Sequence, residues 1–218
     1  MIRAALLDVD GTLLASNDAQ ARAWSDALAE AGHAANFNAI RRAIGLGGDR
    51  LLHAVARLDE SEEPGQTISR RRREILLERY ARGLLPTLGA RDLVEWLRAR
   101  GLRVVIATGA SAGEVTTLLR AAGVDDLVDA AVTADDAART KPAPDILVAA
   151  LERAGVPAAD AVMIGDTPYD VAAARAASVP AIALRCGGWN DADLTGASVF
   201  ADPQDLLERY RESPLREV

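Results

Sequence analysis

Asp8 and Asp10 follow a short apolar run, residues 4–7, within the segment Asp8-Val9-Asp10-Gly11-Thr12. The run is typical of a buried strand, and residues two apart on an extended chain point to the same side. Two carboxylates that close repel each other unless a cation or a shared proton relieves them. The segment therefore predicts a metal-assisted acid/base or nucleophile site, although acidic turn residues alone are common.

Other polar residues follow later apolar runs, namely Thr108 with Gly109 and, further along, Asp166. In open parallel sheets, ligands bind at the carboxyl ends of the strands. Lys141 precedes a helix and could reach the same crevice, and Asp170 would lie one helical turn beyond Asp166. A few hard oxygen ligands suit Mg²⁺. A hydroxyl, backbone amides and an ammonium suit a phosphate.

Lys141 is the single lysine in a chain that contains 24 arginines. Arginine evidently serves here wherever any cation will do. A position that remains lysine in this background is one where a compact ammonium is needed and a planar guanidinium does not replace it.

The elements that must position these residues alternate between short strands and helices, which predicts a parallel sheet covered on both faces. After the first strand, apolar runs predict strands over residues 103–108, 130–133, 161–164, 181–184 and 199–200. Helical patterns lie between them, over residues 112–122, 145–154, 169–177 and 203–212.

One segment interrupts this alternation. Residues 16–85 show only helical pattern, with helices expected over residues 21–31, 38–44, 49–58 and 68–82. We therefore expect a catalytic core of residues 1–15 and 86–218 and an inserted helical domain of residues 16–85. A run of four arginines at 70–73 is interpreted as a solvated helix face, with Glu74 and Glu78 as partners.

The composition limits the function. The net charge of −7 argues against a nucleic-acid partner, because binding to phosphate backbones needs a basic face. A lone cysteine, Cys186, excludes a disulfide within the chain and a cysteine-rich metal site, and we treat it as structural. The N-terminal apolar run is broken by acids, unlike a signal peptide, and no stretch is long enough to span a bilayer. We expect a cytoplasmic protein without membrane association.

The chemistry-bearing segments, in this order, resemble the four motifs of the haloacid dehalogenase superfamily. They are Asp8-Val9-Asp10-Gly11-Thr12, Thr108-Gly109, Lys141-Pro142 and Gly165-Asp166-Thr167-Pro168-Tyr169-Asp170. The helical insert resembles the cap of that superfamily, and the nearest subgroup contains phosphoglycolate phosphatases and beta-phosphoglucomutases. The resemblance implies a Rossmann-like, three-layer α/β/α core with an inserted α-helical cap.

The resemblance also implies residue roles. Asp8 would be the nucleophile that accepts the phosphoryl group, and Asp10 would protonate the leaving oxygen and later deprotonate water. Mg²⁺ would be held by Asp8, the Asp10 carbonyl and Asp166, with Asp170 ordering its waters.

Phosphate binding is expected from Thr108, Gly109 and Lys141. Arg50, with Asp49 beside it in the glycine-rich segment 45–50, is the candidate for substrate specificity, although that segment could equally be a simple turn capped by Asp49.

We therefore expect a magnesium-dependent phosphatase that acts on a small phosphorylated metabolite, such as phosphoglycolate or a sugar phosphate, as a monomer or homodimer. A phosphoryl transferase of the beta-phosphoglucomutase type is the alternative, and a non-enzymatic phospho-acceptor module is a remote one. The presence of Asp10 disfavours the dehalogenase branch, which has no leaving-group acid.

Overall fold

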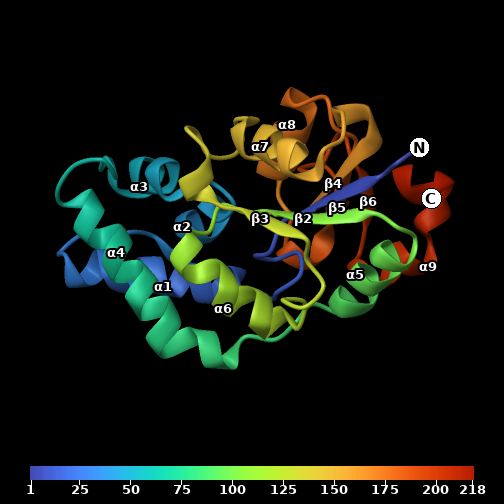
Figure 1. The fold of residues 1–218 in the computed structure, drawn as a ribbon. Coiled ribbons are helices and arrows are strands. Elements are labelled where there is room, and N and C mark those ends of the chain that lie inside the picture. The colour runs from blue at the N-terminus through green and yellow to red at the C-terminus, as the bar shows by residue number, and fades with distance from the viewer.

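The structure is a computed structural model that describes residues 1–218, apart from the side chain of Glu217. Within this described part, six strands form one sheet in the order β3-β2-β1-β4-β5-β6 (Figure 1). All neighbouring strands pair in parallel. The strands are β1 (Ala4–Leu7), β2 (Arg103–Ala107), β3 (Ala130–Val132), β4 (Ala161–Gly165), β5 (Ala181–Leu184) and β6 (Ser198–Phe200). The predicted α/β class with a parallel sheet is confirmed.

Helices cover both faces of the sheet (Figure 1). One face carries α7 (Asp145–Ala154) and α8 (Pro168–Ala176), and the other carries α5 (Ala90–Ala99), α6 (Ala112–Ala122) and α9 (Pro203–Glu208). The central strand β1 supplies both faces: Leu6 packs with the α7 and α8 side, whereas Leu7 packs with the α5 and α6 side. This alternation explains why every residue of β1 is buried and why the strand reads as a continuous apolar run.

Four helices and a short helical extension lie between β1 and α5. They are α1 (Asn17–Glu30), α2 (Phe37–Ala43), α3 (Gly48–Ala56) and α4 (Gly65–Ile75), followed by a π-helical turn (Leu76–Tyr80) and a 3₁₀ turn (Ala81–Gly83). α1 begins four residues before the predicted start. Its first turn contains the polar residues Asn17 and Gln20, which the apolar pattern excluded but which are buried against the functional site.

Two other predicted helices are shorter than expected. The predicted helix at 68–82 ends as α-helix at Ile75 before the π-helical turn, and the one at 203–212 ends at Glu208 before a 3₁₀ turn (Tyr210–Glu212).

The two chain segments that join the helical insert to the core lie side by side. Ala15 N–H donates to the Leu85 carbonyl at 2.9 Å, and Thr87 N–H donates to the Leu13 carbonyl at 3.1 Å. The insert therefore leaves and re-enters the core at one place, which is the arrangement of a hinge. We accordingly keep residues 16–85 as our proposed cap. It lies at the end of the molecule opposite both chain termini (Figure 1).

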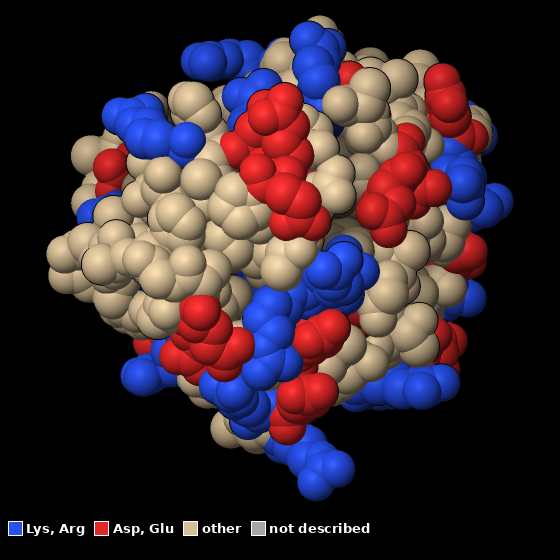
Figure 2. Space-filling model, turned by 90° about the vertical axis from the view of Figure 1, so that its left-hand side faces the viewer, with Lys and Arg blue, Asp and Glu red and all other residues tan. Residues whose placement is uncertain are grey.

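The cap face on the left of Figure 1 carries acidic and basic side chains interspersed (Figure 2). A nucleic-acid-binding face would carry a large basic area. No area of one sign dominates that view. None of the helices in the described residues is both long and apolar enough to cross a membrane.

Candidate active site

The carboxyl ends of the central strands bring the predicted acids together. Asp8 follows β1 and Asp166 follows β4, while Asp170 lies in the first turn of α8. All three side chains are buried, and each offers a carboxylate oxygen within 4.8 Å of those of the other two. This proximity follows from the parallel pairing of β1 with β4, in which Leu7 lies opposite Ile164.

Lys141, which precedes α7, lies among these acids. Its Nζ is 2.8 Å from Asp8 Oδ1 and 2.7 Å from Asp170 Oδ1, and the residue is only 1% exposed. Burial alone would lower the pKa of Lys141, but the Asp170 and Asp8 carboxylates raise it above its ordinary value. The lysine is therefore a fixed, buried positive charge beside Asp8.

One ammonium does not balance three carboxylates. Burial raises the pKa of Asp8 to about 7 against the opposing effect of Lys141. Burial, together with the neighbouring Asp170 and Asp8, also raises the pKa of Asp166 well above its usual value. The excess negative charge and the hard oxygen donors fit a divalent cation at this cluster. Asp8, Asp166 and Asp170 are the candidate ligands for such a cation.

Asp166 is fixed by residues that the sequence interpretation did not select. Thr12 Oγ1 donates to Asp166 Oδ1 at 3.1 Å, and Asn17 Nδ2 donates to Asp166 Oδ2 at 2.9 Å. The carboxylate also lies directly against Gly11 and Gly187, where any Cβ would overlap it. Gly11 has a φ of 77° as well, so glycine is required there for two reasons.

Asp10 points away from the acid cluster and toward the start of the cap. Its carboxylate accepts hydrogen bonds from Ser16 Oγ and, at 2.9 Å, from Gln20 Nε2. Burial raises the pKa of Asp10 above its ordinary value, although these two hydrogen bonds oppose the shift. A carboxyl group that retains its proton nearer to neutral pH suits a general acid. Ser16 and Gln20 are four residues apart at the start of a helix, and such residues lie on the same side of it. This spacing is the sequence signal that could have identified them as partners of one carboxylate.

Asp8 and Asp10 open into a cavity of about 40 Å³, enough for a few waters or a small ligand. Its core side also includes Thr108 and Gly109, for which phosphate binding remains a prediction. Thr108 is fully buried, and its Oγ1 accepts from the Ala110 N–H at 3.1 Å. The structure thus brings Asp8, Asp10, Thr108 and Gly109 to one cavity, with Lys141 bonded to Asp8 behind it.

The cap side of this cavity is mostly apolar, with two polar residues, Gln20 and Arg72. The apolar side chains are Trp24, Ile44, Leu46 and Leu51. Trp24 is buried and lines the cavity, and the Arg72 guanidinium lies 4.9 Å from its ring centroid.

Arg72 corrects the interpretation of the four-arginine run. Its Nη1 donates to the buried Glu114 carboxylate of α6 and, at 3.2 Å, to Gln20 Oε1. Only Arg71 pairs with Glu74 and Glu78 on the surface, as predicted for the run. Successive residues of an α-helix are rotated by about 100° around its axis. Neighbours in a run therefore point to different surroundings.

The glycine-rich segment does reach the cavity, through Gly45, Leu46 and Gly48. Arg50, however, lines a separate surface hollow with His53 and Arg57. Asp49 accepts a hydrogen bond from Thr140 Oγ1 at 2.9 Å and so joins α3 of the cap to the core. The specificity role expected for Arg50 and Asp49 remains a prediction that this arrangement does not support.

The fold and site together define a class: an α/β protein with a cluster of buried aspartates at the carboxyl ends of its central parallel strands. The chain belongs to the haloacid dehalogenase-like hydrolases, whose family model matches residues 2–178.

Relatives and solved structures agree with this assignment. The chain is 34% identical to a phosphoglycolate phosphatase of Rhodospirillum rubrum, covering 93% of this chain and 88% of that protein. It is 35% identical over 188 residues to the Arabidopsis thaliana chloroplastic protein SUPPRESSOR OF QUENCHING 1, but spans only 18% of that protein's length. A hydrolase from Pseudomonas syringae superposes with a TM-score of 0.90 at 30% identity, covering 96% of this chain and 98% of the other.

Proposed function

We propose that this protein is a magnesium-dependent phosphatase that hydrolyses a small phosphate monoester through an aspartyl phosphate on Asp8. The observation that carries the proposal is the placement of Asp8, a buried carboxylate bonded to the single lysine and facing a small cavity that Asp10 and Thr108 share. Membership of the hydrolase family and the phosphatase relatives support it.

In the first step, an Asp8 carboxylate oxygen attacks phosphorus, and the bond from phosphorus to the leaving oxygen breaks. Asp10 donates its proton to that oxygen, so the leaving group departs as an alcohol. Thr108 and the Gly109 backbone bind phosphoryl oxygens as their charge shifts. Lys141 holds Asp8 in place and offsets negative charge near the transferring group.

In the second step, Asp10 removes a proton from water as the water oxygen bonds to phosphorus. The phosphorus bond to Asp8 then breaks, which releases inorganic phosphate and restores the protonated Asp10. Mg²⁺, held by Asp8, Asp166 and the Asp10 carbonyl, would neutralise charge on the phosphoryl oxygens. Asp170, which pairs with Lys141, would order the water molecules around that ion.

A phosphoryl transferase of the beta-phosphoglucomutase type would use the same core residues. A transferase must also hold a sugar and keep water from the aspartyl phosphate, so the two functions differ in what the cap side of the cavity has to do. Product analysis with a hexose 1-phosphate distinguishes the two, since a transferase yields an isomerised sugar phosphate and a phosphatase yields free sugar. We also propose, from the sequence alone, a cytoplasmic location and a monomer or homodimer.

The test is the substitution Asp8→Asn, which removes the nucleophile and preserves the size of the side chain. We expect phosphate release from acetyl phosphate and from a panel of phosphorylated metabolites with Mg²⁺ to fall by about 10³-fold or more. Asp18→Asn makes the same chemical change at an exposed position and should retain activity. A chelator should abolish turnover by the native enzyme, and a folded Asp8→Asn protein that retains turnover would refute the mechanism.

A further inference from the structure

Glu114 is a buried carboxylate outside the motifs of the reaction. It lies in the first turn of α6, is fully buried, and its Oε2 accepts from Ser111 N–H at 3.2 Å and from Ser111 Oγ at 2.6 Å. These bonds form a capping box that fixes the side chain to the start of its helix. Its other oxygen, Oε1, accepts from Arg72 of the cap. The Glu114 carboxylate is therefore bonded to Arg72, a residue that lines the cavity.

Among the described residues, Arg72 is the one cationic side chain that the cap contributes to the lining of the cavity. Its side chain is 12% exposed, so solvent does little to screen its pairing with Glu114. Arg73 also lies near Glu114, at 3.8 Å, but it is 43% exposed and outside the cavity lining. The charge of Glu114 is thus matched mainly by Arg72, and the pair is close to neutral.

The rest of the cap side adds no compensating positive charge. Trp24, Leu46 and Leu51 are apolar, and the Gln20 amide is already bonded to both Asp10 and Arg72. An anionic group on the substrate would therefore meet apolar walls and a guanidinium whose charge is already neutralised. An uncharged oxygen faces no such cost, and Arg72 still has a buried Nε–H without a hydrogen-bond partner.

We propose that Glu114 determines specificity by acting through Arg72, so that the enzyme favours monoesters of short, uncharged alcohols over those whose leaving group carries a carboxylate. The inference rests on the proposed function and narrows its substrate class. Glu114 touches neither phosphate nor Asp8; it sets the charge of the wall against which the leaving group packs.

The test compares two substrates of nearly equal size, 2-hydroxyethyl phosphate and 2-phosphoglycolate, which differ in a terminal hydroxymethyl or carboxylate. We expect the native enzyme to have the higher kcat/KM with 2-hydroxyethyl phosphate. Glu114→Gln leaves Arg72 positively charged and keeps a residue type that the capping box accepts. It should move the ratio of the two kcat/KM values toward 2-phosphoglycolate by about tenfold or more. The reason is that the unneutralised charge of Arg72 would act on the substrate carboxylate with little screening by solvent.

Glu30→Gln is the matched control, since it makes the same change in an arginine pair on the cap surface. It should leave the ratio unchanged. Arg72→Gln is the opposite charge change: with Glu114 left without its partner, the ratio should move further toward 2-hydroxyethyl phosphate. This second variant tests the proposal independently if Glu114→Gln folds poorly.

A ratio that neither Glu114→Gln nor Arg72→Gln moves overturns the inference, as does a native preference for 2-phosphoglycolate. Acetyl phosphate separates this failure from that of the proposed function. Turnover of acetyl phosphate with no activity on either alcohol ester leaves the phosphatase standing and overturns the substrate class. Inactivity toward acetyl phosphate as well overturns both.

Discussion

At the scale of single residues, the site contains two carboxyl groups, those of Asp8 and Asp166, whose burial opposes their ionisation. Asp8, Asp166 and Asp170 lie together in the interior, where Asp8 and Asp170 share one ammonium, that of Lys141. Burial raises the pKa of Asp8 to about 7 and that of Asp166 well above its usual value. The native state without a metal therefore holds protons that the unfolded chain has already released near pH 4.

This proton difference predicts a pH dependence of stability. Between about pH 4 and pH 7, the unfolded state binds fewer protons than the folded state, so the free energy of unfolding falls as pH rises. Relative to Asp8→Asn, the native protein in chelator should lose up to about 1.4 kcal/mol per pH unit across this window. Urea unfolding at several pH values measures the difference, and added Mg²⁺ should restore stability. A free energy of unfolding of the native protein that rises with pH relative to that of Asp8→Asn would contradict the expectation.

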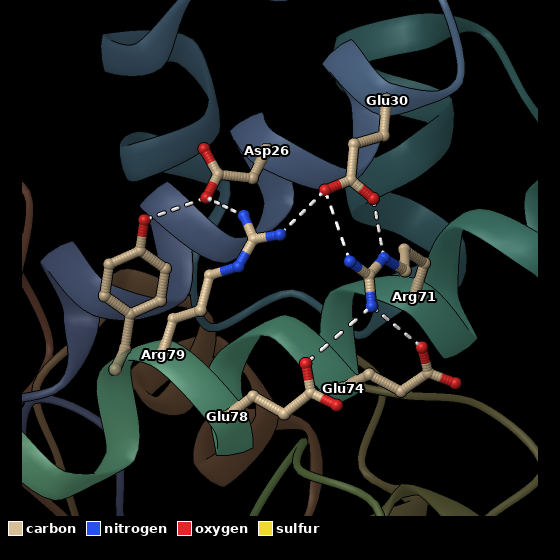
Figure 3. A network of polar contacts seen from close by, with 7 residues as sticks. Asp26, Glu30, Arg71, Glu74, Glu78 and Arg79 are labelled. Atoms are coloured by element: carbon tan, nitrogen blue, oxygen red, sulfur yellow. Dashed lines mark hydrogen bonds and ion pairs between the residues drawn. The ribbon is translucent and has the colours of Figure 1, made fainter.

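At the scale of elements, α4 shows how one helix divides a run of like residues among three surroundings. Arg70 bonds to Thr67 on its own helix, Arg71 joins the surface network, and Arg72 turns inward to Glu114. In the surface network, Arg71 and Arg79 both reach Glu30 of α1, and Arg79 also reaches Asp26 (Figure 3). The network ties α4 and the π-helical turn to α1 within the cap.

The two neighbours should respond differently to the same substitution. Arg71→Ala removes exposed ion pairs, which contribute little, so we expect a fall in Tm of no more than about 4 °C and unchanged kcat/KM. Arg72→Ala leaves Glu114 buried without its main partner and should cost about 3 kcal/mol. Thermal and urea unfolding measure both effects. Equal losses of stability in the two variants would show that the buried pairing of Arg72 contributes no more to the free energy of unfolding than the exposed pairs of Arg71.

At the scale of the whole molecule, the cap is docked on the core on more than one side of the cavity. Arg42 of α2 stacks on Trp189 of the core, 4.4 Å from the ring centroid, and Tyr169 donates a hydrogen bond to the Arg42 carbonyl at 2.9 Å. On another side, Arg72 meets Glu114. The adjacent linkers at residues 15 and 85 give the cap one place about which to open. Closing over the cavity excludes water and completes the site.

Weakening one docking contact should lower the share of closed enzyme. Arg42→Ala removes the stacking on Trp189, and we expect KM to rise about two- to fivefold with little change in kcat. Arg100→Ala is the matched control, because Arg100 stacks on Trp96 within the core at 3.8 Å and does not cross to the cap. Steady-state kinetics on one substrate compare the two. An unchanged KM for Arg42→Ala, or an equal rise in the control, would contradict this view of closure.

The sequence by itself determined the class of fold and selected the core residues that the structure brings together at the candidate site. Asp8, Thr108 and Asp166 each follow an apolar run of strand length, which is a local signal. Because the carboxyl ends of parallel strands lie at the same edge of a sheet, these residues could be predicted to lie close together. The solitary Lys141 was likewise visible from composition, and the structure places it against Asp8. The helical insert could be predicted because its pattern lacks strands over some 70 residues.

Only the tertiary structure decided which cap residues face the chemistry. Gln20 and Arg72 are polar residues in helices, and nothing local separates them from solvent-facing residues; their burial depends on how the cap is placed over the core. The same placement leaves Arg50 in a different hollow and gives Glu114 its partner. Contacts between elements distant in the chain depend on the packing of whole surfaces, which residue order and periodicity do not encode locally.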